Sequence, residues 1–444
     1  MVFDRLILNL WGDLLASGSL QMGYKRGSST AQCSYLVMET VAHFLREGTN
    51  PIIVALDMTM AFDKCKFSIL FSKISTKIPP VVTRALIFVY EKQYAWTRWG
   101  NSKSELFKIT NGTRQGSVLS PALFTVYVQE LLDRLQASGM GCHVGHTFLG
   151  AVAWADDFLL SAPTRSSMQS MLDLASSFAR EVGLEFSTDP DPAKSKSKAI
   201  YVIGRQTGLE KPAPLVLSGQ DLPWVAHATH LGHEFHQDGT MDMDTRMRRG
   251  SFIGRCLEVQ EAFHFATPDD TLGAVKLYCG DLYGGMLARL DSPAAIQLMN
   301  CWGVTVKDVW GVPRATHRVY ARWLSGHHTS FKEDLLSRWV KYYQSLLSSH
   351  SPEVAVIARV AARDLRSTTG ANNRLIANAT GLDAATATSQ QVRSELRRRE
   401  EAMTEGEEAV ALELSSLLED RHRMKLEDLN TTTITLRIDN LCKD

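Results

Sequence analysis

The chain has 444 residues, of which 44% are hydrophobic and 22% charged, a composition typical of a folded protein of two or three domains. Basic and acidic residues both number 48, so net charge gives no reason to expect a nucleic-acid partner. The sequence has no apolar run of the length of a membrane span, and Asp4, Arg5 and Asp13 interrupt the first apolar stretch, which argues against a secretory signal. We therefore expect an intracellular protein, cytoplasmic or nuclear.

The first 100 residues predict helices around one buried strand. A helix is expected to start near Ser28–Thr30, whose hydroxyls can cap it. Six consecutive apolar residues at 51–56 predict a buried strand. Residues 61–99 predict helices, interrupted at Pro79-Pro80.

Between 105 and 240, short strands alternate with helices. Strands are predicted at 106–109 and 198–203, a hairpin at 148–162, and helices at 120–135 and 168–182. This mixture predicts an α+β fold, an antiparallel sheet with helices packed on one side.

From 241 onward, helical patterns dominate, including 331–347 and 352–365. The charged tail from Ser389 fits either an amphipathic helix or a solvated, frayed one.

Two adjacent aspartates, Asp156 and Asp157, lie between apolar runs, where a hairpin would place them at its turn. Taken alone, the pair fits an ordinary acidic turn. The strand at 51–56 leads directly into Asp57, however, and pairing beside the hairpin would bring three carboxylates to one end of the sheet. Such a cluster can hold two Mg²⁺ ions about 4 Å apart, one activating a primer 3′-hydroxyl and one neutralising a triphosphate.

A turn-rich stretch at 111–121 leads into the predicted helix at 120, with Ser120 as its expected N-cap and Pro121 at the first helical position. Gly116 lets the backbone approach a ligand closely, and Gln115 can hydrogen-bond a sugar or a base edge.

Together these segments resemble the reverse transcriptases of LINE-type retrotransposons, which lack long terminal repeats. The matching segments follow the family's order: a fingers motif at 23–30, motif A at 56–63, motif B at 112–124, motif C at 155–157, motif D at 183–188 followed by Lys194, Lys196 and Lys198, and motif E at 230–233. The resemblance implies a right-hand polymerase that copies an RNA template onto a DNA primer from deoxynucleoside triphosphates, using two Mg²⁺ ions, or Mn²⁺ in their place.

The resemblance also implies roles for individual residues. Asp57, Asp156 and Asp157 would be the catalytic metal ligands, and Phe62 would be the sugar gate that excludes a 2′-hydroxyl. The residues implied to bind the substrate are Phe62, Arg114, Gln115, Gly116 and Lys194. Leu231 and Gly232 would belong to the primer grip.

The implied domains are a partial fingers at 1–50, a palm at 51–235 with inserted finger helices at 64–105, a helical thumb at 236–350, and a C-terminal helical region with a charged tail at 351–444. The short stretch before Gly23 leads us to expect an N-terminally truncated element.

Two departures keep an alternative open. Ala155 stands where we expect an aromatic residue, and the stretch before Gly23 is short for a fingers strand. The alternative is a catalytically impaired retroelement remnant that only binds nucleic acid. An RNA-templated RNA polymerase would share the aspartates, but Phe62 as a sugar gate argues against it.

Trp96 and Trp99, beside Arg98, offer rings on which single-stranded bases can stack. Aromatic core packing is the interpretation that the sequence favours for both rings.

Overall fold

The computed structural model describes residues 2–189, 191, 194–204, 206, 210–280, 282, 284–316, 318–326, 328–402, 416 and 418. Its chain forms two compact units, the first made of residues 1–240 with 348–359 and the second of 241–347 with 360–444. The first unit combines a sheet with helices, which confirms the predicted α+β class. No helix in the described ranges is long and apolar enough to cross a membrane.

The first unit contains the helices α1 (Val2–Trp11), α2 (Thr30–Arg46), α3 (Ala61–Lys64), α4 (Phe67–Ser75), α5 (Pro80–Glu91), α6 (Ser120–Ala137) and α7 (Arg165–Val182), and the short 3-10 helix η1 (Gly12–Leu15). Its main sheet contains β1 (Ile52–Asp57), β8 (Ala151–Trp154), β9 (Asp157–Ala162) and β10 (Lys198–Tyr201). Its two-stranded pairs are β2 (Tyr94–Ala95) with β5 (Phe107–Lys108), β3 (Arg98–Trp99) with β4 (Ser102–Lys103), β6 (His143–Val144) with β7 (Thr147–Phe148), β11 (Leu215–Leu217) with β12 (Gln220–Leu222), and β13 (His227–His230) with β14 (His233–His236).

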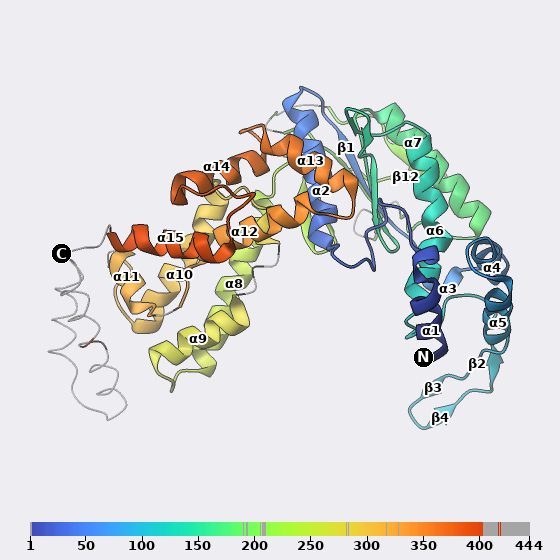
Figure 1. Ribbon diagram of the computed structural model, residues 1–444, viewed down its shortest axis with the longest axis horizontal. Helices are drawn as coiled ribbons and strands as arrows, with labels where there is room; N and C mark the ends of the chain where they lie inside the picture. The colour runs from blue at the N-terminus through green and yellow to red at the C-terminus, as the bar shows by residue number, and fades with distance from the viewer. Residues whose placement is uncertain are drawn as a thin grey trace. The chain divides into compact units, whose positions relative to one another are not determined.

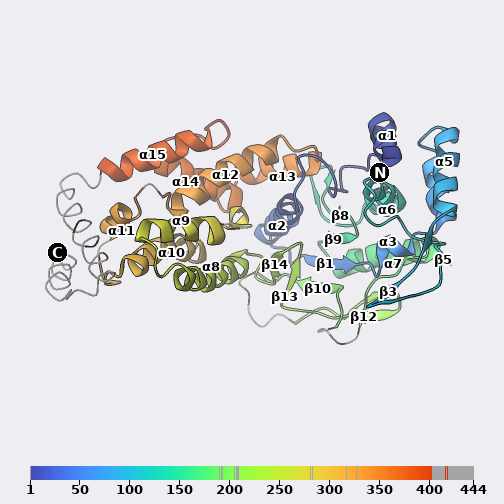
Figure 2. The same ribbon diagram turned by 90° about the horizontal axis from the view of Figure 1, so that it is seen from below.

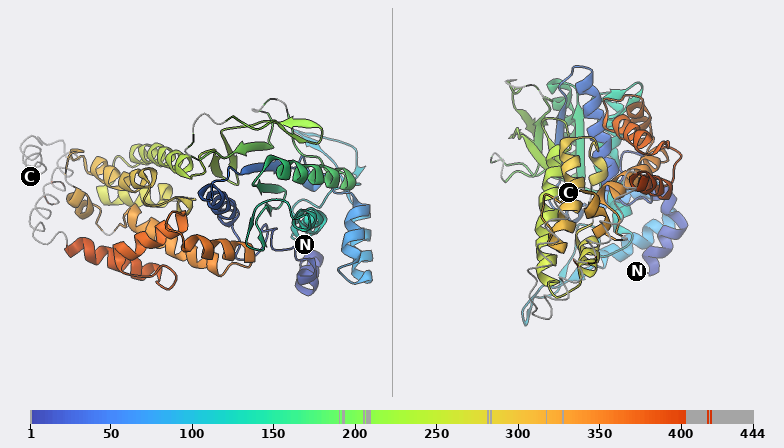
Figure 3. Two further views of the ribbon diagram at one scale, coloured as in Figure 1. Left: turned by 90° about the horizontal axis from the view of Figure 1, so that it is seen from above. Right: turned by 90° about the vertical axis from the view of Figure 1, so that its left-hand side faces the viewer.

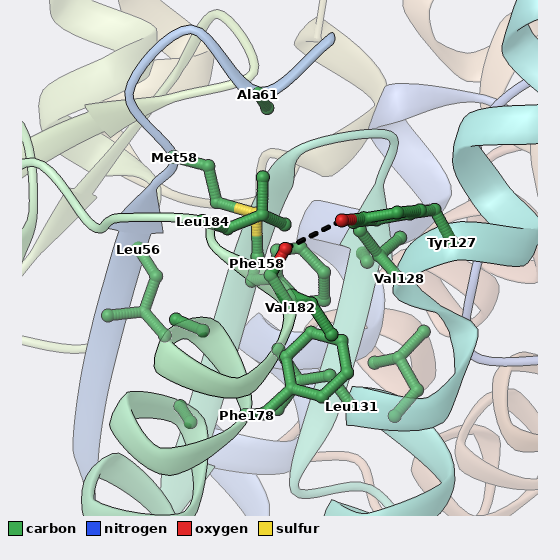
Figure 4. Close-up of a cluster of buried hydrophobic side chains, with 14 of the residues drawn as sticks. Leu56, Met58, Ala61, Tyr127, Val128, Leu131, Phe158, Phe178, Val182 and Leu184 are labelled. Atoms are coloured by element: carbon green, nitrogen blue, oxygen red, sulfur yellow. Dashed lines mark hydrogen bonds between the residues drawn. The ribbon is translucent and has the colours of Figure 1, made fainter. Parts of the chain in front are cut away.

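The main sheet runs in the order β10–β1–β9–β8 and is antiparallel throughout. Side chains alternate along a strand, so Leu56 of β1 faces the same side as its partner Phe158 of β9. Both residues belong to a buried core shared with α6 and α7, where the Tyr127 hydroxyl donates a hydrogen bond of 2.6 Å to the Val182 carbonyl (Figure 4). Helix α2 contacts β8 and β9 from the other side (Figures 1 and 2). Helices therefore cover both faces of the sheet, and the prediction of one covered side is wrong.

The ends of the predicted helices follow their capping chemistry. Ser29 caps α2 by accepting a hydrogen bond from the Gln32 amide, as predicted. Ser120 is the first residue of α6 and not its N-cap, which is Leu119, and the Ser120 hydroxyl donates to the Arg114 carbonyl at 2.6 Å.

The helices predicted over 61–99 end at Glu91, and the chain then forms the hairpin strands β2 and β3. Trp99 is 88% exposed and Trp96 47% exposed, so the prediction of core packing for these two rings is wrong.

The second unit is helical and contains α8 (Asp242–Ala262), α9 (Pro268–Cys279), η2 (Gly285–Leu287), α10 (Pro293–Trp310), α11 (Arg318–Leu324), α12 (Phe331–Leu347), α14 (Thr368–Thr380) and α15 (Ser389–Ala402). Helix α13 (Pro352–Ala362) begins in the first unit. Helices α8, α9 and α10 pack on one another (Figures 1 and 3).

The predicted helix at 331–347 coincides with α12. The start of the charged tail is the helix α15, which ion pairs join to α12, Arg393 with Asp334 at 3.5 Å and Arg397 with Glu333 at 3.3 Å. Most of the predicted tail after residue 402 lies outside the described residues.

Candidate active site

Asp57 and Asp157 lie directly opposite each other at one end of the sheet. Asp57 is the last residue of β1, Asp157 is the first of β9, and the two are Cα partners in the antiparallel register. Directly opposed side chains share a face and lie close together, and like charges in that position destabilise a sheet. The sequence predicted this meeting of strand ends, and the register confirms it.

Asp156 reaches the same end of the sheet from the turn between β8 and β9. Ala155 and Asp156 form the two-residue connection, and Ala155 has a φ of +59°. Two-residue hairpins require a positive φ at their first turn position, where bulky side chains are disfavoured. A small residue therefore suits position 155, and the aromatic ring next to the aspartates is that of Trp154, which pairs with Asp157. Ala155 gives no reason to expect an impaired site.

A glutamine that the sequence gave no reason to select supports this turn. Gln21 is fully buried, and its side-chain oxygen accepts hydrogen bonds from the amides of Ala155 at 2.9 Å and Gly23 at 3.0 Å. Its amide nitrogen donates to the Ala155 carbonyl at 3.0 Å. A Cβ on Gly23 would lie 2.6 Å from the Ala155 nitrogen, so only glycine fits this close approach. The fingers motif therefore packs against the turn that carries the aspartates.

The three carboxylates repel one another. Burial, and secondarily the charges of Asp156 and Asp57, raise the pKa of Asp157 to about 6, against the opposing effect of Lys196. Burial is also the main cause of the raised pKa of Asp156, to which Asp57 adds. Lys196 Nζ lies 3.8 Å from Asp57 Oδ2 and is the cation that relieves part of this repulsion.

The chemistry of this cluster fits a divalent metal. Three carboxylates offer oxygen ligands, which Mg²⁺ and Mn²⁺ prefer, and a cation would remove the repulsion that raises the two pKa values. The described residues contain no group of three His, Cys, Asp or Glu side chains already arranged as a ligand set. The agreement between this cluster and a divalent metal ion therefore rests on its oxygen donors and on its negative charge.

The loops of motifs A and B are joined backbone to backbone. The Gly112 amide donates to the Cys65 carbonyl and the Thr113 amide to the Phe62 carbonyl, both at 2.8 Å. Gly112 has a φ of +87°, and a Cβ there would lie 3.0 Å from Asp63. Phe62 in turn stacks on Phe124 of α6, with ring centroids 4.2 Å apart. Phe62, the proposed sugar gate, is thus held at its backbone by Thr113 and at its ring by Phe124.

The candidate nucleotide loop at 114–116 follows directly. Arg114 lies 3.9 Å from the buried carboxylate of Asp4 in α1, and Gln115 donates to Asp63 Oδ1 at 3.3 Å. Gly116 has a φ of +78°, a conformation that favours glycine and agrees with the backbone freedom expected of this residue.

Of the three lysines that follow motif D, the one beside the aspartates is Lys196 and not Lys194, which was assigned to the substrate. Lys194 is exposed and lies 4.0 Å from Asp191, whereas Lys196 lies next to Asp57. Ser197 is fully buried, and its hydroxyl accepts a hydrogen bond of 3.1 Å from the Asp57 amide.

Leu231 and Gly232 form the two-residue turn between β13 and β14, with φ values of +50° and +76°. Leucine is rare in this conformation, which carries strain. The structure joins the two residues in one turn, and their role in a primer grip stays a prediction.

The family described as "Reverse transcriptase (RNA-dependent DNA polymerase)" matches residues 6–206, a range that contains all three aspartates. Among curated proteins, the chain is 26% identical over 247 residues to the Pol polyprotein of a type-1 retrotransposable element R2 of Nasonia vitripennis, covering 54% of this chain and 24% of that protein. It is 30% identical over 175 residues to the Pol polyprotein of the type-2 element R2DM of Drosophila melanogaster, covering 38% of this chain and 16% of that protein. The chain thus spans a quarter or less of the length of these relatives.

Among solved structures, an apo telomerase of Candida tropicalis is similar over 92% of this chain and 60% of its own, with a TM-score of 0.40 and 10% identity. A telomerase of Candida albicans in complex with a fragment of telomeric RNA has a TM-score of 0.36 and 11% identity, covering 82% of this chain and 53% of its own. At these scores the likeness carries no argument about this chain.

Proposed function

The chain belongs to the reverse transcriptases of non-LTR retrotransposons, and we propose that it is an RNA-directed DNA polymerase that adds deoxynucleotides to the 3′-hydroxyl of a primer on an RNA template. The observation that carries this proposal is the pairing of Asp57 with Asp157 at the end of the sheet, next to Asp156 in the turn. Three carboxylates in this arrangement are the donor set that nucleotidyl transfer requires.

In this proposal each element supplies one part of the reaction. Asp57, Asp156 and Asp157 would hold two Mg²⁺ ions, which would supply activation of the hydroxyl and charge neutralisation of the triphosphate. Phe62, held by its stack on Phe124, closes the space in which a ribonucleotide would place its 2′-hydroxyl. Gln115 and Gly116 contact the incoming nucleotide.

The cation next to the reacting phosphates is Lys196, because it lies beside Asp57 while Lys194 is paired with Asp191. Arg114 contacts the triphosphate once it leaves Asp4, to which it is bound loosely at 3.9 Å. Leu231 and Gly232 position the primer end.

The domain assignment is part of the same proposal. The four-stranded sheet with α6 and α7 corresponds to the palm within 51–235. Residues 1–50, which include α2, and the insertion at 64–105 correspond to parts of the fingers, and the helices within 236–350 to the thumb.

Primer extension on an RNA template with Mg²⁺ tests the proposal. We expect the native chain to incorporate deoxynucleotides and the double variant Asp156→Asn plus Asp157→Asn to lose more than about a hundredfold of that rate. Asp173→Asn, an exposed aspartate of α7, is the matched control. Equal rates in the native and double-variant chains would refute the catalytic role, and binding of nucleic acid without incorporation by the native chain would select the impaired remnant.

A further inference from the structure

The strands β2–β5 and β3–β4 form one long hairpin between Tyr94 and Lys108. Figure 1 shows it extending from the end of α5 away from the main sheet. Every residue from 96 to 108 is exposed. An exposed hairpin with several aromatic rings calls for an explanation, because such rings in water are usually covered by a partner.

One face of this hairpin combines rings with cations. Trp96 lies between β2, which begins at Tyr94, and β3, which begins at Arg98, and we infer from the alternation of side chains along an extended chain that the three share a face. Cross-strand partners also share a face, which adds Lys103, opposite Arg98, and Lys108, opposite Tyr94. Lys103 Nζ lies 4.3 Å from the centroid of the Trp96 ring, in agreement with this assignment. We call these five residues the basic–aromatic face.

The charge of this face is unbalanced. Arg98 and Lys103 are direct cross-strand partners, a placement of like charges that destabilises a hairpin unless an anion lies between them. In the described part of the chain, neither of them nor Lys108 has an acidic partner, and Arg98 donates to the Gly100 carbonyl instead. Residues 92–108 contain four basic residues and one acidic residue, although the whole chain has zero net charge.

We propose that the basic–aromatic face binds single-stranded nucleic acid, which under the proposed function, on which this inference rests, is the unpaired RNA template. Rings two residues apart on a strand lie about 7 Å apart, which lets successive unstacked bases occupy them. The three cations hold the phosphates between those bases. The hairpin leads through 109–113 into the candidate nucleotide loop at 114–116, so both surfaces belong to one continuous stretch of chain.

The opposite face of the same hairpin supplies a matched control. The register places Trp99 and Phe107 there, and their cross-strand partners Ser102 and Ala95 are uncharged. Trp99→Ala removes a ring that is more exposed than Trp96, so it separates loss of an exposed ring from loss of this face. Because both tryptophans are exposed, neither substitution opens a cavity in the core.

The test is fluorescence anisotropy of the full chain with a short, unstructured, labelled RNA, without Mg²⁺ and without nucleotides. Trp96→Ala should weaken binding about fivefold or more, which is the loss of one stacked base. Lys103→Gln should lower the slope of log affinity against log salt by about 0.7. Trp99→Ala should change affinity less than about twofold. DNA of the same sequence should show the same losses, because rings and phosphates do not sense the 2′-hydroxyl.

Native affinity in the Trp96→Ala and Lys103→Gln variants would overturn the proposal. An equal loss from Trp99→Ala would overturn the choice of face, and equal effects of Trp96→Ala on single-stranded and duplex RNA would overturn the stacking role. The assay involves no chemistry, so absence of incorporation in the primer-extension test would leave its result standing. A chain that polymerises but binds RNA without this face would refute this inference alone.

Discussion

If Phe62 is the proposed sugar gate, its substitution should change the choice of substrate and should not abolish activity. Its ring stacks on Phe124 at 4.2 Å, and its carbonyl is bound by the Thr113 amide, so the ring has one fixed place. Phe62→Ala would open that place to a 2′-hydroxyl. We expect the ratio of ribonucleotide to deoxynucleotide incorporation to rise about tenfold or more, measured in single-nucleotide extension. Phe67→Ala, which removes a neighbouring ring from the cluster around Tyr90, should leave the ratio unchanged. The gate assignment is wrong if both variants keep the native ratio.

Gln21 is a positioning residue, because it binds the backbone of the turn and none of the reacting groups. Gln21→Leu would leave the buried amide and carbonyl of Ala155 without their hydrogen bonds at 2.9 and 3.0 Å. Each such loss costs about 1–3 kcal/mol, and here it loosens the turn that carries Asp156. We expect kcat to fall about tenfold or more and the Mg²⁺ concentration for half-maximal rate to rise.

A second glutamine provides the control for Gln21→Leu. Gln129 also binds the N-terminal segment, accepting from the Gly18 amide at 2.8 Å, but it does not touch the aspartate turn. Gln129→Leu should keep the native Mg²⁺ dependence. A merely structural role for Gln21 would lower the amount of folded protein without changing the Mg²⁺ dependence of what remains.

The aspartates of the candidate site could be predicted from the sequence, but the residues that position them or pair with them could not. Asp57 and Asp157 could be paired in advance, because each adjoins a strongly apolar strand and strand ends meet at one edge. Gln21 is 134 positions from Ala155, and no local pattern connects them. Lys194 and Lys196 differ by two residues in a stretch without regular structure, so periodicity could not select the one beside Asp57.

At the scale of elements, the β13–β14 hairpin should respond to acid. His230 is buried, neither of its ring nitrogens has a hydrogen-bond partner among the described residues, and burial lowers its pKa to about 4. The unfolded pKa is about 6.5, so the neutral ring's contribution is fully present above that pH and is lost as pH falls towards 4. The difference amounts to about 3 kcal/mol. His230→Leu should therefore unfold at lower pH than the native chain in circular-dichroism titration.

The same hairpin carries a control for the acid experiment. His227 is half exposed and is bonded to Glu234, so His227→Gln removes an imidazole from the same hairpin that is not buried without a partner. It should not move the acid midpoint downward as His230→Leu does. If neither substitution shifts the midpoint downward, another group controls acid unfolding.

Elements with one strong pattern were predicted well, and the hairpin at 94–108 was not. The apolar run at 51–56 was compatible with a buried strand and the spacing of 331–347 with a helix. The strand β1 and the helix α12 confirm these predictions. Residues 94–99 contain aromatic rings that a core would also accept, and their strands are two residues long. The rings are exposed because the hairpin extends away from α5. The local propensities of these residues do not determine that direction.

At the scale of the molecule, the division into two units predicts where a metal ion acts. The three aspartates belong to the unit of 1–240 with 348–359, and their like charges oppose pairing at the adjoining ends of β1, β8 and β9. Mg²⁺ at a hundred times its dissociation constant would add about 2.7 kcal/mol of stability to the state that binds it. Hydrogen exchange of the full chain should therefore slow on adding Mg²⁺ in these three strands, with no comparable slowing in α8, α9 and α10.

Asp157→Asn makes this experiment decisive. The substitution removes one repelling charge and one ligand, so exchange in β9 should be slower than native without Mg²⁺ and insensitive to its addition. Asp173→Asn in α7 should keep the native response. Hydrogen exchange could instead slow equally in both units, or still slow in the Asp157→Asn variant. Either result would mean that Mg²⁺ acts at a site other than the strand ends that carry Asp57 and Asp157.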